Sequence, residues 1–187
     1  MNPNILNQKT IKNPLLFNGI GLHSGKDLKV KILPSPPNTG ITFIRSDLKK
    51  NNIIQPNVFN VSEASFCTTI SNEFNVKIST IEHLMAALYV KGIDNAVVEV
   101  NGPEIPIMDG SSQEFLNLID DIGLEISDKP IKLIKIDKEV SILNGSKFIK
   151  IKPSTANLKI DFEINFPNSL IGKQRNNINV YEDDLNK

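Results

Sequence analysis

The 187-residue sequence has no tryptophan, a single cysteine (Cys67) and only two histidines (His23 and His83). One cysteine excludes a disulfide within the chain and suits a reducing compartment, so we expect a cytoplasmic protein. Lysine plus arginine equal aspartate plus glutamate at 21 each, which gives no electrostatic indication of nucleic-acid binding. No run of about 18 apolar residues is present, so no membrane span is expected. Residues 1–8 lack the apolar run of a signal peptide.

Hydrophobic residues make up 40% of the chain, which is enough for a core, and the length allows one large or two small domains. Strand-like segments are interspersed with two helical segments, which predicts the α+β class. We expect a first α+β domain over residues 1–126 and a second, over 127–187, made of strands only. After Gly25 and again after Gly145, a strand, a Pro-Ser pair, a turn with Asn and another strand follow in the same order. This order predicts two similar sheet-plus-helix domains of a duplicated fold, the second incomplete.

The most informative segment, residues 79–91, has the pattern of a helix. Ser79 is a suitable N-cap, and Glu82 stands three residues later, at the spacing of a capping box. A basic residue and a glycine, Lys91-Gly92, predict the C-terminal end. One apolar face is formed at helical spacing by Ile81, Leu84, Met85 and Leu88. The opposite face has no Lys, Arg or Asp before Lys91, so we expect a helix that is covered on both faces.

The other elements follow from the same kinds of pattern. A second helix is expected to begin at Ser111, with Glu114 again three positions later. Residues 123–130 are polar and predict a linker. The Asn144-Gly145 pair predicts a hairpin turn. Strands are expected at residues 10–17, 26–33, 41–45, 95–100, 131–142, 147–152 and 158–166.

Glu82 and His83 are the titratable groups of the first helix. Burying such a pair is costly unless something satisfies it. A metal ion with a bound water would do so, because histidine offers a neutral nitrogen ligand and glutamate a proton acceptor. The residues alone leave two other interpretations open: Glu82 could only cap the helix through the Ser79 N–H, and His83 could be a buried histidine bonded to a backbone carbonyl. A Glu-His pair is weaker evidence for a metal site than His-Glu-x-x-His, in which two ligands share one helix face.

Three segments closely resemble the zinc-dependent UDP-3-O-acyl-N-acetylglucosamine deacetylases, which act in lipid A biosynthesis. These are GIGLHSGK from Gly19, STIEHL from Ser79 and EIPIMDGS from Glu104. The resemblance covers about residues 10–175 in order. It implies two α+β domains packed helix to helix around an active site, Zn2+ as the cofactor and UDP-3-O-acyl-N-acetylglucosamine as the substrate. It also implies that His83 is the first zinc ligand and Glu82 the general base.

The resemblance further implies groups that are not found in this sequence. The family's second histidine ligand and aspartate ligand lie on a His-x-x-x-Asp helix, and another histidine and a lysine assist the reaction. His23 lies in the glycine loop and does not match the second ligand. We therefore expect a truncated zinc-dependent hydrolase, corresponding to the N-terminal three-fifths of the family protein. It would need a missing C-terminal half and be inactive, or nearly so, alone. The alternative is a non-catalytic remnant or nucleotide-sugar-binding module that lacks the metal site.

Four further residues are candidates for substrate binding. Phe66, Cys67 and Thr68 match a family segment that lines the site, although Cys67 could equally be an inert buried thiol. His23 either contacts the substrate or braces its glycine loop. Asp109, which precedes Gly110-Ser111, is expected to be a turn and helix-start residue rather than a catalyst.

Overall fold

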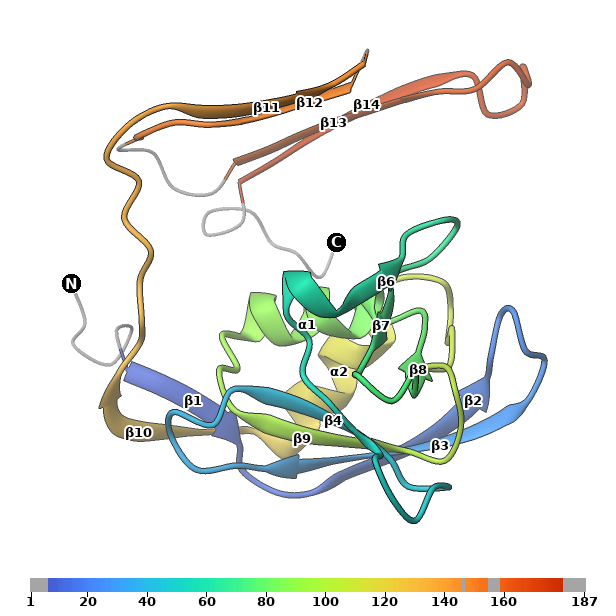
Figure 1. The fold of residues 1–187 in the computed structure, drawn as a ribbon, viewed down its shortest axis with the longest axis vertical. Helices are drawn as coiled ribbons and strands as arrows, with labels where there is room; N and C mark the ends of the chain where they lie inside the picture. The colour runs from blue at the N-terminus through green and yellow to red at the C-terminus, as the bar shows by residue number, and fades with distance from the viewer. Residues whose placement is uncertain (1–6, 146, 155–158, 180–187) are drawn as a thin grey trace. The chain divides into compact units, whose positions relative to one another are not determined.

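The computed structural model describes residues 7–145, 147–154 and 159–179 (Figure 1). The chain divides into two units, residues 1–131 and 132–187, and these are taken one at a time below. Mixed sheets and two helices are present among the described residues, so the predicted α+β class is confirmed. The duplication of a domain stays a prediction. The predicted domain boundary after residue 126 lies within a strand, β10 (Leu124–Pro130).

A five-stranded sheet forms the base of unit 1. Its strands, in spatial order, are β2 (Leu15–Ile20), β3 (Asp27–Pro34), β9 (Ala96–Val100), β4 (Ile41–Arg45) and β5 (Ile53–Ile54). β4 runs parallel to β9 and every other pair is antiparallel. Burial alternates along β3, where Leu28, Val30 and Ile32 are buried and the lysines between them are not. This period of two leaves one face of the sheet apolar and the other charged.

The two helices, α1 (Glu82–Lys91) and α2 (Gln113–Ile122), lie on the same side of this sheet (Figure 1). The core between helices and sheet includes Leu84, Leu88, Phe115, Leu116 and Ile119. Phe115 also meets Phe17 of β2 edge to face, with ring centroids 5.6 Å apart. The prediction that this helix is covered on both faces is wrong for the described residues, because Ala86, Tyr89 and Val90 are exposed.

Two smaller sheets complete unit 1. Beside the helices lie a 3-10 turn, η2 (Val58–Asn60), and the strands β6 (Val61–Glu63), β7 (Thr69–Ser71) and β8 (Lys77–Ile78). β1 (Asn7–Ile11) pairs with β10, so the predicted linker at residues 123–130 is wrong. The single strand predicted at residues 10–17 is also wrong: a bend at Lys12 and Asn13, followed by Pro14, separates β1 from β2, and proline cannot donate to a ladder.

The described residues of unit 2 form two hairpins. β11 (Val140–Asn144) pairs with β12 (Lys147–Ile151), and β13 (Lys159–Asn165) pairs with β14 (Lys173–Asn179). The strand predicted at residues 131–142 is wrong over most of its length, because residues 131–139 belong to no strand. The Asn-Gly turn is confirmed, with Gly145 at φ +60°. Every described side chain of β11 and β12 is exposed. In neither unit do the described residues contain a helix of the length and apolar character that a membrane crossing needs.

Candidate active site

The turn into α1 is built differently from a capping box. The Ser79 N–H donates to the Pro103 carbonyl at 2.9 Å, and the Ser79 hydroxyl donates to the same carbonyl at 3.2 Å. Thr80 follows in the left-handed region, at φ +57°, which is rare for a β-branched residue. Ile81 then precedes the helix and contributes no side-chain cap. The predicted N-cap role of Ser79 is therefore wrong.

Glu82 is the first residue of α1 and is half-buried. Its Oε2 accepts a hydrogen bond of 3.0 Å from the backbone N–H of Thr68. The carboxylate thus faces the segment before β7 rather than the Ser79 N–H, which is bonded to Pro103. The interpretation of Glu82 as only a helix cap is excluded. The bond also joins two segments that the sequence patterns assigned to the same site.

The segment before β7 places its three predicted site residues differently. Thr68 lies against Glu82 through its N–H and is half-buried. Cys67 is also half-buried, with its Sγ 3.7 Å from the Thr69 hydroxyl, so it is not a fully buried thiol. Phe66 has φ +65° and is 98% exposed. The structure therefore brings Thr68 against the start of α1, keeps the neighbouring Cys67 half-buried and leaves the Phe66 ring in solvent.

His83, the second residue of α1, is half-buried and lies near Asp109. The Asp109 carboxylate accepts hydrogen bonds of 2.9 Å from both the N–H and the hydroxyl of Ser111. The bond from the Ser111 N–H lowers the pKa of the Asp109 carboxyl, and the charge of His83 lowers it further. The predicted turn role of Asp109 is confirmed, and its carboxylate lies within electrostatic range of the predicted zinc ligand.

The described residues do not make a complete metal site. They contain no group of three or more His, Cys, Asp or Glu side chains able to hold a metal ion. A catalytic zinc is held by about three protein ligands. His83 can supply one nitrogen donor, so the residues present fit only one part of such a site.

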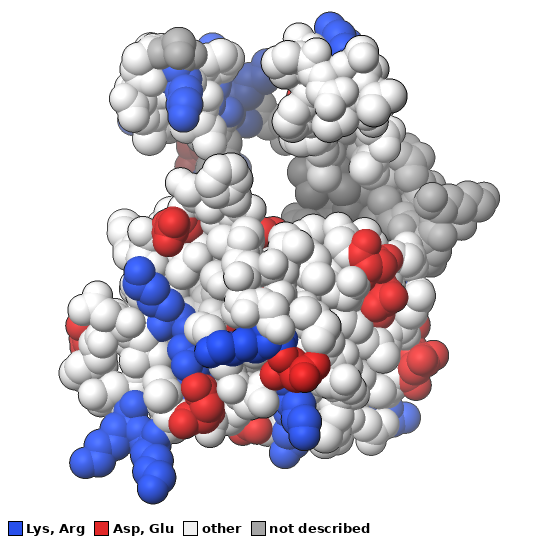
Figure 2. Space-filling model, turned by 90° about the vertical axis from the view of Figure 1, so that its right-hand side faces the viewer, with Lys and Arg blue, Asp and Glu red and all other residues white. Residues whose placement is uncertain are grey.

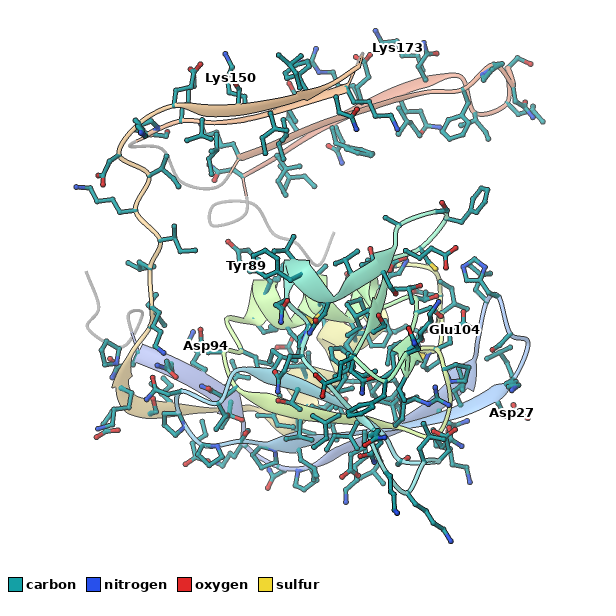
Figure 3. The ribbon with its side chains drawn as sticks, viewed as in Figure 1. Asp27, Tyr89, Asp94, Glu104, Lys150 and Lys173 are labelled. Atoms are coloured by element: carbon teal, nitrogen blue, oxygen red, sulfur yellow. The ribbon has the colours of Figure 1, made fainter. Side chains whose placement is uncertain are left out.

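His23 lies exposed in the turn between β2 and β3, and a buried carboxylate holds this turn in place. The His23 N–H donates to Glu104 Oε1 and the Ser24 N–H to Glu104 Oε2, each at 2.9 Å. The Thr80 hydroxyl donates to Glu104 Oε1 at 3.1 Å. Figure 3 marks Glu104 on the segment that follows β9. Sequence reasoning missed its role, although a glutamate within the apolar, proline-flanked run 103–107 was a usable signal.

The environment of Glu104 sets its ionisation. Burial alone would raise the pKa of this carboxyl, which is 1% exposed. The hydrogen bonds from the His23 N–H, from Ser24 and from Thr80 outweigh burial and hold the pKa of Glu104 below its ordinary value. Glu104 is therefore charged in the folded protein at neutral pH.

Lowering the pH is expected to remove stability that Glu104 contributes. Because folding lowers its pKa, this contribution is fully present above the ordinary value of 4.5 and is lost as the pH falls through the folded-state pKa. The difference in unfolding free energy between wild type and Glu104→Gln should thus shrink between about pH 7 and about pH 3. Urea denaturation at a series of pH values measures it. A difference that does not change over this range would contradict the assignment.

Replacing Gly21 by alanine is expected to destabilise unit 1 by about 1–3 kcal/mol. An added Cβ would overlap with the Ser24 hydroxyl oxygen and with a Glu104 carboxylate oxygen, and the carboxylate cannot move without breaking the bonds described above. Urea denaturation measures the loss. Gly25→Asn is the matched control, because φ there is +63°, which asparagine tolerates, and an added Cβ meets no atom within 4 Å. Equal stability of both variants would contradict the close approach at Gly21.

Charge does not single out another site on the face drawn in Figure 2. There, Lys and Arg side chains are interspersed with Asp and Glu side chains across wide uncharged areas. This matches the balanced composition of the chain.

Comparison with known proteins identifies the family. The family model for UDP-3-O-acyl N-acetylglycosamine deacetylase matches residues 8–187. The UDP-3-O-acyl-N-acetylglucosamine deacetylase of Haemophilus ducreyi is 41% identical over 176 residues, which is 94% of this chain and 58% of the relative. The enzyme of the same name from Actinobacillus pleuropneumoniae serotype 3 is 40% identical, with the same coverage. The one from Glaesserella parasuis is 40% identical over 92% of this chain and 56% of the relative.

The chain therefore spans little more than half the length of these relatives. The matches nevertheless extend over nearly all of the sequence, including all three motifs that carried the resemblance. The protein belongs to the UDP-3-O-acyl N-acetylglycosamine deacetylase family.

Proposed function

We propose that this chain forms one wall of the active site of a zinc-dependent, cytoplasmic deacetylase acting on UDP-3-O-acyl-N-acetylglucosamine in lipid A biosynthesis. One observation carries the proposal: the Glu82 carboxylate is turned toward the Thr68 N–H, directly before His83, in a chain of this family. The names of the relatives support the substrate and reaction. The single cysteine suits the compartment.

In this proposal Glu82 is the general base. The hydrogen bond from Thr68 uses Oε2, and no donor among the described residues binds Oε1. The free oxygen can therefore accept a proton from a water that attacks the acetamide carbonyl. The hydrogen bond from the Thr68 N–H also restricts the orientation of this carboxylate, which is carried on the first turn of α1.

We assign His83 as one ligand of the zinc ion. When bound, zinc lowers the pKa of its water and polarises a carbonyl oxygen. Since the described residues provide no complete ligand set, we propose that the other ligands come from the part of the family protein that this chain does not span. Thr68 and Cys67 beside Glu82, together with His23 and Phe66 on exposed loops, remain the proposed substrate contacts.

A second candidate is a nucleotide-sugar-binding module without catalysis. The lack of a complete metal-binding group among the described residues favours it. This module would bind the nucleotide sugar and release no acetate, whether or not further protein is supplied.

Joining this chain to the part of the Haemophilus ducreyi relative that it does not span would test the proposal; we call the product the joined protein. We expect the joined protein to release acetate from UDP-3-O-acyl-N-acetylglucosamine, and a chelator to stop it. The 187-residue chain alone should release none. A folded, zinc-loaded joined protein without activity would favour the binding module.

The two histidines provide a matched pair of variants. In the joined protein, His83→Ala is expected to weaken zinc binding by about 100-fold or more. Loss of a residue that only hydrogen-bonds to a metal ligand costs about 10–100-fold in affinity, and loss of the ligand itself should cost more. His23→Ala should leave zinc binding unchanged, because its backbone N–H, not its side chain, makes the contact with Glu104. Competition against a chelator of known affinity measures both. Wild-type zinc binding by His83→Ala would refute the ligand assignment.

A further inference from the structure

We propose that Glu104 is a positioning residue that clamps the His23 loop, residues 21–25, to the turn that enters α1. Its single carboxylate holds both segments, so they keep one fixed spacing. The consequence for substrate rests on the function proposed above, in which His23 lies on one of these segments and Glu82 and His83 follow the other.

The contacts divide the carboxylate between two parts of the chain. Two backbone N–H groups of the His23 loop, those of His23 and Ser24, each bind a different oxygen at 2.9 Å. The Thr80 hydroxyl binds Oε1 at 3.1 Å from the other part. Oε1 therefore receives a donor from each segment. Movement of one segment relative to the other must break a bond to a charged group.

Burial makes these bonds hard to replace. Glu104 is 1% exposed, and none of the ion pairs among the described residues includes it. A buried carboxylate without a cation is tolerated only where hydrogen bonds satisfy it. Water cannot readily take the place of a lost donor. The two segments are thus coupled through the need to satisfy one charge.

The backbone around the clamp is adapted to it on both sides. Thr80 is 2% exposed and holds φ +57°, a conformation that a β-branched residue adopts only where its surroundings enforce it. On the other side, Gly21 has no Cβ, which leaves room for the Glu104 carboxylate. Thr80 lies two residues before Glu82, so the clamp acts where α1 begins.

The coupling is tested in the folded 187-residue chain by nuclear magnetic resonance. Thr80→Val removes the hydroxyl and should shift the amide resonances of His23 and Ser24, while Thr80→Ser should restore them. Asp94→Asn is the matched control, because the Asp94 carboxylate accepts a 2.8 Å bond from the Lys9 N–H elsewhere in unit 1. It should leave the His23 and Ser24 resonances in place. A loss of stability alone would not move folded-state resonances, so unchanged His23 and Ser24 signals in Thr80→Val would overturn the clamp.

A binding measurement tests the consequence for substrate. Titration of the joined protein with UDP-3-O-acyl-N-acetylglucosamine should show about tenfold weaker binding to folded Glu104→Gln than to wild type. A glutamine has one acceptor oxygen and cannot accept from the N–H groups of both His23 and Ser24, so the His23 loop would lose its fixed position. Equal binding would overturn the positioning role. If Glu104→Gln does not fold, Thr80→Val takes its place in the titration. If the wild-type joined protein does not bind the nucleotide sugar, the proposed function fails, and the resonance test still decides whether the clamp exists.

Discussion

Replacing Glu82 by glutamine is expected to lower acetate release by the joined protein about 10²–10⁴-fold, the range for losing a general base. A neutral amide cannot take the proton of the attacking water. Its oxygen can still accept the hydrogen bond from the Thr68 N–H, so the start of α1 should keep its structure. The ratio kcat/KM for the nucleotide sugar measures the loss.

Glu73→Gln is the matched control for this change. Glu73 is exposed in the turn between β7 and β8, and the same substitution there should leave the rate within about twofold. Zinc content and the urea midpoint of Glu82→Gln should both equal those of wild type. Should Glu82→Gln keep most of the activity while folded and loaded with zinc, another group must be the base.

The second large effect concerns stability. Phe115→Ala is expected to reduce the unfolding free energy of unit 1 by about 3–5 kcal/mol. The Phe115 ring is 1% exposed, belongs to the core between helices and sheet, and meets Phe17 at an interplanar angle of 71°. Its removal leaves a cavity between α2 and β2 that the surrounding side chains cannot fill. Urea denaturation followed by resonances of unit 1 residues measures it, because the chain has two units.

Phe59→Ala removes the same ring from an exposed position and provides the comparison. Phe59 is 93% exposed in η2, so its loss should change the unfolding free energy by less than about 0.5 kcal/mol. If the two phenylalanine variants were equally stable, the core described for unit 1 would be wrong.

Much of the fold was predictable where local pattern decides it. The strand at residues 41–45 has the predicted bounds, and the helix that ends at Gly92 does so with that glycine in the left-handed conformation, at φ +67°. The pairing of β1 with β10 was missed because it joins residues that lie far apart in the sequence. β10 is also mostly exposed and shows no regular alternation of buried and exposed residues.

In the candidate site, too, some features could be predicted from the local sequence and others depend on tertiary contacts. Glu82 and His83 were selected from residue type and a family motif, and the structure places them together at the start of α1. The capping box failed because a tertiary partner, the Pro103 carbonyl, takes the Ser79 groups. Glu104 was missed because its three donors come from two distant segments, and only folding brings these to one carboxylate.

The hairpins of unit 2 have a consequence for handling the protein. β13 and β14 place Ile160 and Phe162 on one side and the ion pairs Lys173–Glu163 and Arg175–Asp161 on the other. Two-stranded ribbons of this kind are marginally stable by themselves. Phe148 is 74% exposed and Phe162 is 62% exposed, so the described hairpins of unit 2 carry aromatic rings that are accessible to solvent. Adsorption to plastic and dye binding by the purified polypeptide should therefore involve these ribbons as well as the exposed Phe59 and Phe66 rings of unit 1.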